Sequence, residues 1–205
     1  MARGREKRGC MKNKILLLSG LILVGCVPSW NPLYTEKDLV FDPLLVGTWA
    51  PVQVKEGAKE TWAFTKGGDM LYQLQQTDED GRKAEFEARL VKLKERRFLD
   101  LYLTKVADDD VKLNAWAGFS LVPAHLILKV VQLEPTLKIA PMNPDWMKNF
   151  VKRHPEAIAH RVVQDGNIVL TATTSDLQKF FLEHADDEEL FGGAMELKRK
   201  GAGDK

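Results

Sequence analysis

Polar and apolar residues alternate over much of the chain after residue 40, and this pattern predicts β-strands. Between Ala84 and Leu90, every second residue is apolar and the residues between them are charged. A period of two indicates a strand with one buried face and one solvated face. The apolar positions change parity at Leu90-Val91, which predicts a β-bulge that bends this strand.

Similar short segments, separated by turn signals, predict an antiparallel meander. Residues 77–81 (TDEDG) predict a hairpin turn, and Glu95-Arg96 predicts a tight reversal. About eight to ten strands with short connections favour a closed barrel, because closure removes exposed strand edges. A β-sandwich is the alternative. The other predicted strands are a segment with Trp62 and Phe64 on one face, a segment with Met70, Tyr72 and Leu74 on one face, and residues 98–104, 125–133, 136–140, 158–163, 167–172 and 195–199.

Two helices interrupt this series of strands. Asn143 followed by Pro144 is a typical helix start, and apolar residues then recur at helical spacing over 144–154. Ser175 and Gln178 have the spacing of a capping box, which predicts a second helix over 175–185. The expected fold class is therefore mainly β, an antiparallel barrel with two short helices.

The first 25 residues have the features of a secretory signal peptide. Residues 1–14 contain six basic residues, and residues 15–25 form an uncharged apolar run. A helix that crosses a bilayer needs about 20 apolar residues, so this run is too short for a permanent span. Met11 precedes a compact signal peptide of ordinary proportions, so translation from Met1 and translation from Met11 are both open.

Leu23-Val24-Gly25-Cys26 resembles a bacterial lipobox. The resemblance implies cleavage before Cys26, a diacylglycerol thioether on Cys26 and an acylated amino terminus. Several acyl chains hold a protein on a membrane without a transmembrane helix. If the cell has two membranes, Val27 after the cysteine resembles the pattern of lipoproteins sorted to the outer membrane, which would place the domain in the periplasm. The expected organisation is a signal peptide (1–25), a tether or arm (26–40), one β domain (41–200) and a flexible tail (201–205).

Removal of the leader changes the charge balance. The full chain of 205 residues has a formal net charge of +1, whereas the part after residue 25 has 24 basic and 28 acidic residues. A mature domain with a net charge of −4 argues against nucleic acid as a partner. Cys10 would leave with the leader and Cys26 would carry lipid, so no internal disulfide is expected.

Phe41-Asp42 followed by Gly47-Thr48-Trp49 resembles the opening of the lipocalin and calycin group. In that group a tryptophan at this position plugs the closed end of the barrel, and a late helix precedes a final strand. The chain lacks a second motif like Thr-Asp-Tyr, and the helix at 144–154 is an insertion in the lipocalin pattern. The chain also resembles small bacterial lipoproteins of unassigned function that open with a Pro-containing arm and a Gly-Thr-Trp strand.

The residues that could carry chemistry give no catalytic or metal motif. No serine lies in a nucleophile elbow, and His154 and His160 do not have the spacing of metal ligands on one face. The acidic runs 108–110 and 186–189 lack the spaced oxygens and glycine of a calcium loop, so they are interpreted as solvated loops. We therefore expect a protein that is not an enzyme and that has no metal and no cofactor.

Residues 113–123 (LNAWAGFSLVP) do not fit the strand pattern. Apolar residues in a loop must be buried, so this segment is either a lid over the barrel mouth or ordinary core. One hypothesis is a membrane-anchored lipoprotein that binds a small hydrophobic ligand in its barrel. The alternative is an interaction or structural module of the cell envelope that docks another envelope protein, with a solid core and no small ligand. The candidate ligand-binding wall residues are Trp62, Phe64, Tyr72, Phe86, Leu101 and Trp116.

Overall fold

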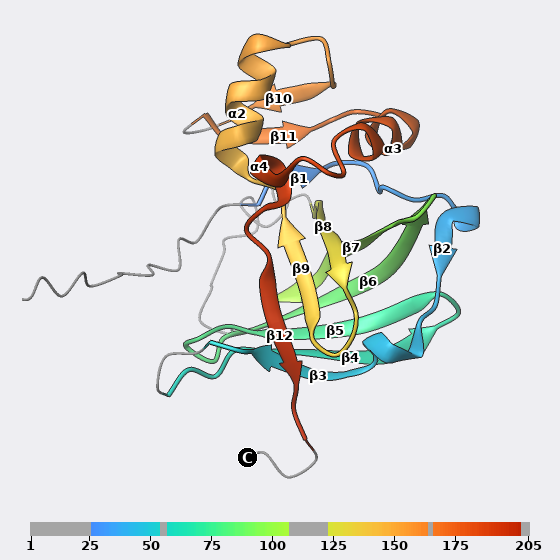
Figure 1. Cartoon of the computed structure of the whole chain (residues 1–205), viewed down its shortest axis with the longest axis vertical. Coiled ribbons are helices and arrows are strands. Elements are labelled where there is room, and N and C mark those ends of the chain that lie inside the picture. Colours follow the sequence, from blue (N-terminus) through green and yellow to red (C-terminus); the bar gives the residue numbers. More distant parts are fainter. Residues whose placement is uncertain (1–25, 54–56, 107–122, 164–165, 202–205) are drawn as a thin grey trace, which may run out of the picture.

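The computed structural model describes residues 26–53, 57–106, 123–163 and 166–201. In this part of the chain eight strands form a closed antiparallel barrel (Figure 1), and each strand is paired with its two neighbours. The last strand lies between the first and the seventh, and the seventh also pairs with the sixth, which closes the ring. The barrel, and not the sandwich, is therefore the correct alternative. Its strands in spatial order are β3 (Gly47–Pro51), β4 (Thr61–Gly68), β5 (Leu71–Thr77), β6 (Lys83–Leu93), β7 (Arg96–Val106), β8 (His125–Gln132), β9 (Leu137–Pro141) and β12 (Met195–Arg199).

The expected bulge at Leu90-Val91 is wrong. The register of β6 against β7 is continuous from Phe86 to Leu93, and the irregularity lies between Glu85 and Phe86. Leu90 packs inside the barrel, whereas Val91 and Leu93 are buried on its outer face. The parity of apolar residues changes because the outer face of β6 is covered at this point, and not because the strand is kinked.

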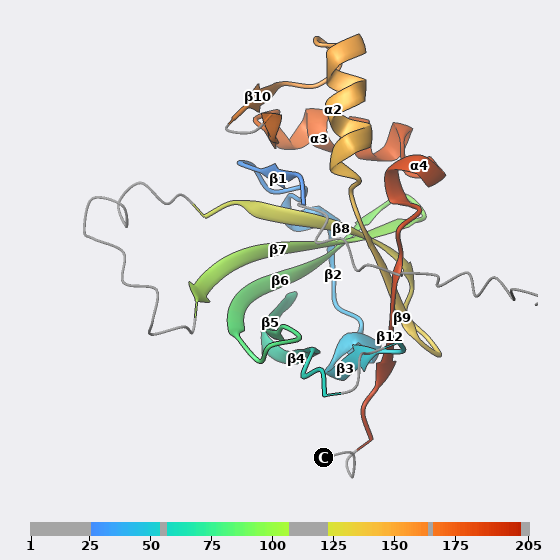
Figure 2. The same cartoon turned by 90° about the vertical axis from the view of Figure 1, so that its left-hand side faces the viewer.

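A layer of helices and short strands covers the barrel and creates that second core. Figure 2 shows this layer above the barrel, between the end of β9 and the start of β12. Phe98 from the outer face of β7 meets Phe181 edge to face, with ring centroids 5.5 Å apart. The layer consists of α2 (Pro144–Arg153), β10 (His160–Val162), β11 (Ile168–Leu170), α3 (Thr174–Glu183) and α4 (Glu188–Phe191).

The two expected helices are present, with one difference in how they begin. Asn143 caps α2, since its side-chain oxygen accepts the backbone N–H groups of Asp145 and Trp146. The cap of α3 is Thr173 and not Ser175, because the Thr173 hydroxyl accepts the N–H of Asp176 and donates to its carboxylate. The short helix α4 was not expected from the sequence. None of the described helices is long and apolar enough to cross a bilayer.

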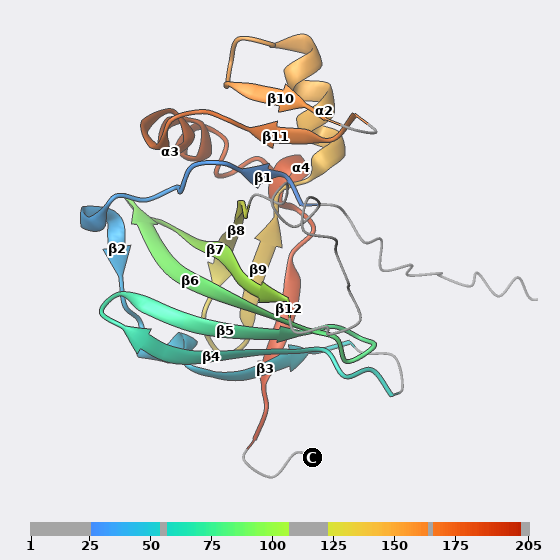
Figure 3. The same cartoon turned by 180° about the vertical axis from the view of Figure 1, so that it is seen from behind.

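The segment expected to be a tether or arm is held along the domain (Figure 3). β1 (Pro28–Ser29) pairs with β8 on one side and with β11 on the other, and Leu33 is fully buried. The arm continues through a 3-10 turn, η1 (Glu36–Asp38), to β2 (Leu39–Val40), which pairs with β6. The arm from Val27 to Val40 is therefore part of the folded structure.

A second 3-10 turn, η2 (Pro43–Leu45), precedes β3 and contributes Leu45 to the barrel core. Leu45 is fully buried in the barrel core, and its carbonyl accepts the indole N–H of Trp49 at 2.9 Å. The Trp49 ring is 1% exposed and is covered by the guanidinium of Arg199, 4.4 Å from the ring centroid. The Gly47-Thr48-Trp49 segment thus places its tryptophan in the barrel core, between Leu45 and Arg199.

Candidate functional site

Five of the six candidate wall residues lie in the barrel interior. Trp62, Phe64, Tyr72 and Leu101 are between 0% and 8% exposed, and Phe86 is partly buried against the same cluster. Trp116 and the rest of the expected lid up to residue 122 lie outside the described residues. The alternation in these strands therefore predicted correctly that these five side chains face inward. Met70, expected on the same strand face as Tyr72 and Leu74, is instead in the turn before β5, with a φ of 52° and 43% of its surface exposed.

These side chains pack against one another. Phe41 stacks on Tyr72 with ring centroids 4.8 Å apart, and Phe64 meets the edge of Tyr72 at 6.5 Å. The Tyr72 hydroxyl accepts the backbone N–H of Asp42 and donates to the backbone carbonyl of the same residue. The buried side chains of Trp62, Phe64 and Tyr72, at most 8% exposed, thus form a packed aromatic cluster in the described part of the barrel.

A pocket of about 320 Å³ lies on the outer face of the barrel, under the arm. Its floor is formed by alternate residues of β6, β7 and β8, and the cross-strand pairs are Arg89 with Asp100, Glu87 with Tyr102, and Tyr102 with His125. The arm supplies Pro32 and Tyr34 to the rim. Three adjacent strands and the arm thus bring seven residues from four parts of the sequence to one pocket.

The most buried polar group of this pocket is the carboxylate of Asp100, whose residue is 2% exposed. One oxygen lies 2.6 Å from Nδ1 of His125, and the other accepts the backbone N–H of Leu33 at 2.8 Å. A carboxylate at Nδ1 places the proton of the neutral imidazole on that nitrogen, so Nε2 is left as an acceptor. Among the described residues Nε2 has no hydrogen-bond partner, and His125 lines the pocket. The pair therefore both fastens the arm and presents an imidazole nitrogen to the pocket.

Arg89 and Glu87 form the charged wall of the pocket. Their side chains are 24% and 39% exposed, with Nη1 and Oε2 3.6 Å apart. The guanidinium also lies over the ring of Tyr34, 5.3 Å from its centroid. Burial raises the pKa of Tyr34, the Arg89 charge lowers it, and the carboxylates of Asp100 and Glu87 raise it, with a net shift upward. The Tyr34 hydroxyl therefore remains protonated and available as a donor.

The sequence contains no sufficient signal for this pocket. Asp100 stands between Leu99 and Leu101, on the face of β7 that is opposite the barrel core, and a carboxylate there suggests only solvent contact. The burial of that face depends on the arm, which arrives from more than sixty residues away. Glu87 and Arg89 lie on the charged face that the alternation in β6 predicts to be solvated. The pocket therefore cannot be found from periodicity alone.

A second pocket, of about 310 Å³, has a basic rim formed by Lys92, Arg96, Arg97 and Lys129. Most of these cations already have partners. Arg96 binds the Asp186 carboxylate, Lys129 donates to the carbonyl of Ala185, and Arg97 lies 3.9 Å from the carboxylate of Asp42. These contacts join the barrel to the helical layer and to the start of η2. Arg96, Arg97 and Lys129 therefore have a structural role.

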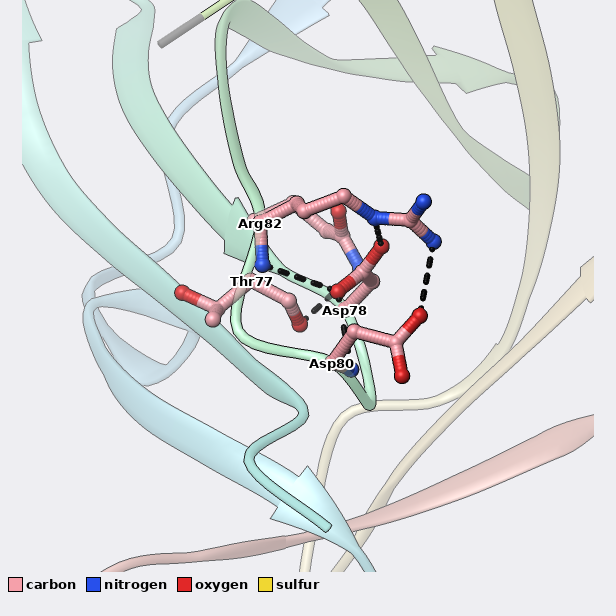
Figure 4. Close-up of polar contacts among 5 residues, drawn as sticks. Thr77, Asp78, Asp80 and Arg82 are labelled. Carbon is pink, nitrogen blue, oxygen red and sulfur yellow. Dashed lines mark hydrogen bonds and ion pairs between the residues drawn. The ribbon is translucent and has the colours of Figure 1, made fainter. Parts of the chain in front are cut away.

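The acidic turn at 77–81 also has a structural explanation (Figure 4). One oxygen of Asp78 accepts the backbone N–H groups of Asp80 and Arg82, and the other binds the Arg82 guanidinium at 2.6 Å. Asp80 accepts a second guanidinium nitrogen at 3.0 Å. Gly81 has a φ of +92°, which this turn requires and which side chains disfavour. The carboxylates thus fix the predicted hairpin.

The other acidic and histidine residues have similar roles where they are described. Asp187 caps α4, whereas residues 108–110 lie outside the described residues. His184 ends α3 and packs against Phe180, with ring centroids 4.6 Å apart. In the described ranges no group of three or more histidine, cysteine or carboxylate side chains could hold a metal ion.

Cys26 lies at the start of the arm. Its side chain is exposed, whereas Val27 is 3% exposed and packs in the core under the helical layer. Parallel pairing of Ser29 with Leu170 brings the start of the arm beside β11. A group attached to the Cys26 sulfur would therefore project from the surface of the folded domain.

Comparison with known proteins gives no relative: no family model, no curated protein and no solved structure matches the chain.

Proposed function

We propose that the protein is a bacterial lipoprotein, anchored by lipid on Cys26, whose β-barrel domain lies outside the cytoplasm. The observation that carries this proposal is the position of Cys26 at the end of the lipobox-like Leu23-Val24-Gly25-Cys26. The exposed Cys26 side chain next to a buried Val27 supports it, because lipid chains on that sulfur can enter a bilayer without disturbing the fold. In a cell with two membranes, the domain would face the periplasm from the outer membrane.

The short link between lipid and domain has a functional consequence. β1 begins two residues after Cys26 and is paired on both sides, so the domain is held against the membrane surface. A loose tether would instead let it reach partners at a distance. We infer a module that works at the membrane surface and is not an enzyme.

The packing of the barrel favours an interaction or structural module over a carrier of an apolar ligand. Aromatic side chains occupy much of the interior, and the pocket under the arm lies on the outer face of the barrel. The basic-rimmed pocket touches the barrel core only through Val130 and Leu133. The barrel then serves as a rigid support for surface contacts with another protein of the envelope. Binding of a small hydrophobic molecule near Phe86 and Leu126, where the barrel core is partly buried, is the second candidate.

Replacement of Cys26 with serine tests the anchoring. The wild-type protein, produced in a bacterium, is expected in the detergent-rich phase of a Triton X-114 separation, and Cys26→Ser is expected in the aqueous phase. The reason is that serine removes the thioether and with it acyl chains worth about 0.8 kcal/mol per buried CH₂ group.

Phase partitioning, followed by immunoblot, is the measurement. Ser29→Ala, a substitution three residues downstream, is the control and should partition like the wild type. If Cys26→Ser remains in the detergent-rich phase, the lipoprotein proposal is wrong.

A further inference from the structure

The pocket under the arm has the composition of a binding site for a small neutral ligand. We propose that it binds a monosaccharide or the terminal sugar unit of a larger glycan. This inference is independent of lipid anchoring, because every residue that forms the pocket belongs to the folded domain. Charge, hydrogen-bonding capacity, wall chemistry and size support it separately.

Most of the pocket's charge is already paired or buried. Glu87 and Arg89 are paired at 3.6 Å, and the Asp100 carboxylate, 2% exposed, already accepts from Leu33 and lies 2.6 Å from Nδ1 of His125. A site for a phosphate or a carboxylate would instead collect cations without adjacent carboxylates. Two carboxylates against one guanidinium therefore disfavour an anionic ligand, and the pairing of Arg89 with Glu87 leaves donors and acceptors for a neutral one.

Donors and acceptors lie side by side in the pocket. The guanidinium of Arg89 offers only donors, the carboxylate of Glu87 offers only acceptors, and Nε2 of His125 is a further acceptor when the ring is neutral. A pair of neighbouring sugar hydroxyls can donate to Glu87 and accept from Arg89 at the same time, because each hydroxyl has both capacities.

The remaining walls are formed by rings. Pro32, Tyr34 and Tyr102 line the pocket, and Tyr102 lies against the His125 imidazole with ring centroids 4.9 Å apart. A tyrosine combines an apolar ring with a polar tip, so it can pack against the C–H face of a pyranose and also bond to its hydroxyls. These walls suit a ligand with one apolar and one polar side.

The size of the pocket agrees with a single sugar ring. About 320 Å³ corresponds to roughly ten water molecules at 30 Å³ each, which is close to the number of non-hydrogen atoms in one pyranose. The pocket is open on one side, so a longer glycan could extend from it into solvent. Floor residues come from three paired strands, which keeps the site preorganised.

Saturation-transfer NMR on the full-length chain in detergent tests this proposal. The probes are D-glucose, D-galactose and N-acetyl-D-glucosamine, with acetate as an anionic and glycine as a zwitterionic comparison. At least one sugar should receive saturation from the protein, and acetate and glycine should receive none. If no sugar receives saturation, or if acetate alone does, the sugar site is refuted.

Two variants localise the signal to the pocket. Arg89→Gln should weaken sugar binding by about tenfold, because it removes a charged donor to a neutral acceptor. Tyr102→Phe keeps the ring and removes only the hydroxyl, and it should weaken binding by a smaller factor. Arg161→Gln, an exposed arginine of β10, is the matched control and should bind like the wild type. Equal binding by Arg89→Gln and the control, with both proteins folded by circular dichroism, would show that the sugar binds elsewhere.

Discussion

Replacing Trp49 with alanine is expected to lower the free energy of unfolding by about 4 kcal/mol. The Trp49 side chain is 1% exposed, bonds to the carbonyl of Leu45 and lies under the Arg199 guanidinium. Alanine would leave a cavity in the barrel core and would deprive that carbonyl of its donor. For a domain of this size, the loss corresponds to a fall in Tm of roughly 10 °C.

Urea unfolding, followed by far-UV circular dichroism, measures this effect. Trp30→Ala is the matched control, because Trp30 is 58% exposed and its loss should change stability by about 0.5 kcal/mol or less. If Trp49→Ala and Trp30→Ala unfold at the same urea concentration, the packing of Trp49 in the barrel core does not stabilise the fold.

Replacing Asp100 with alanine is expected to cost about 3 kcal/mol of stability and to loosen the arm. The buried carboxylate accepts from Leu33 of the arm and pairs with His125, so its removal leaves both partners unsatisfied. Hydrogen exchange should therefore quicken at the amide of Leu33 more than in β4 or β5, which lie away from the arm.

Asp80→Ala is the control for this substitution. It also removes a carboxylate from an ion pair, but the Asp80 side chain is 67% exposed, so the cost should be at most about 1 kcal/mol. Unchanged protection at Leu33 in Asp100→Ala would mean that the arm is held by its strand pairing alone.

The sequence predicted the strands well because local alternation determines them. The hairpin at 77–81, the final strand at 195–199 and the inward side chains of β4 and β5 depend on residues close in sequence. Barrel closure also followed from strand number, since a long meander without closure would leave two edges exposed.

What the sequence could not predict depends on distant contacts. The apolar residues Val91 and Leu93 led to the prediction of a bulge. Nothing near them in the sequence indicates that helices from residues 144–191 cover their face of β6. The charged residues Glu87, Arg89 and Asp100 alternate with apolar residues, which is typical of a solvated face. The arm that covers them comes from the amino-terminal end of the domain, so the local sequence does not reveal it. Periodicity reports that a face is polar, and only the tertiary structure decides whether that face is open or forms a pocket.

The start of the arm was uncertain from the sequence for another reason. Two prolines and no apolar period in residues 27–40 fit both a loose tether and a docked segment. The structure has the docked form, with β1 paired on both sides and Leu33 buried. If Cys26 carries lipid, the same pairing fixes the orientation of the domain relative to the membrane.

Mass spectrometry of the mature amino terminus tests the central claim most directly. The protein is produced in a bacterium, extracted from its membranes and digested, and the amino-terminal peptide is identified. We expect a peptide that begins at Cys26 and carries a diacylglycerol thioether together with an acylated amine. A mature chain whose Cys26 is unmodified, or one that retains residues 1–25, would contradict the proposal that this barrel is anchored to a membrane by lipid.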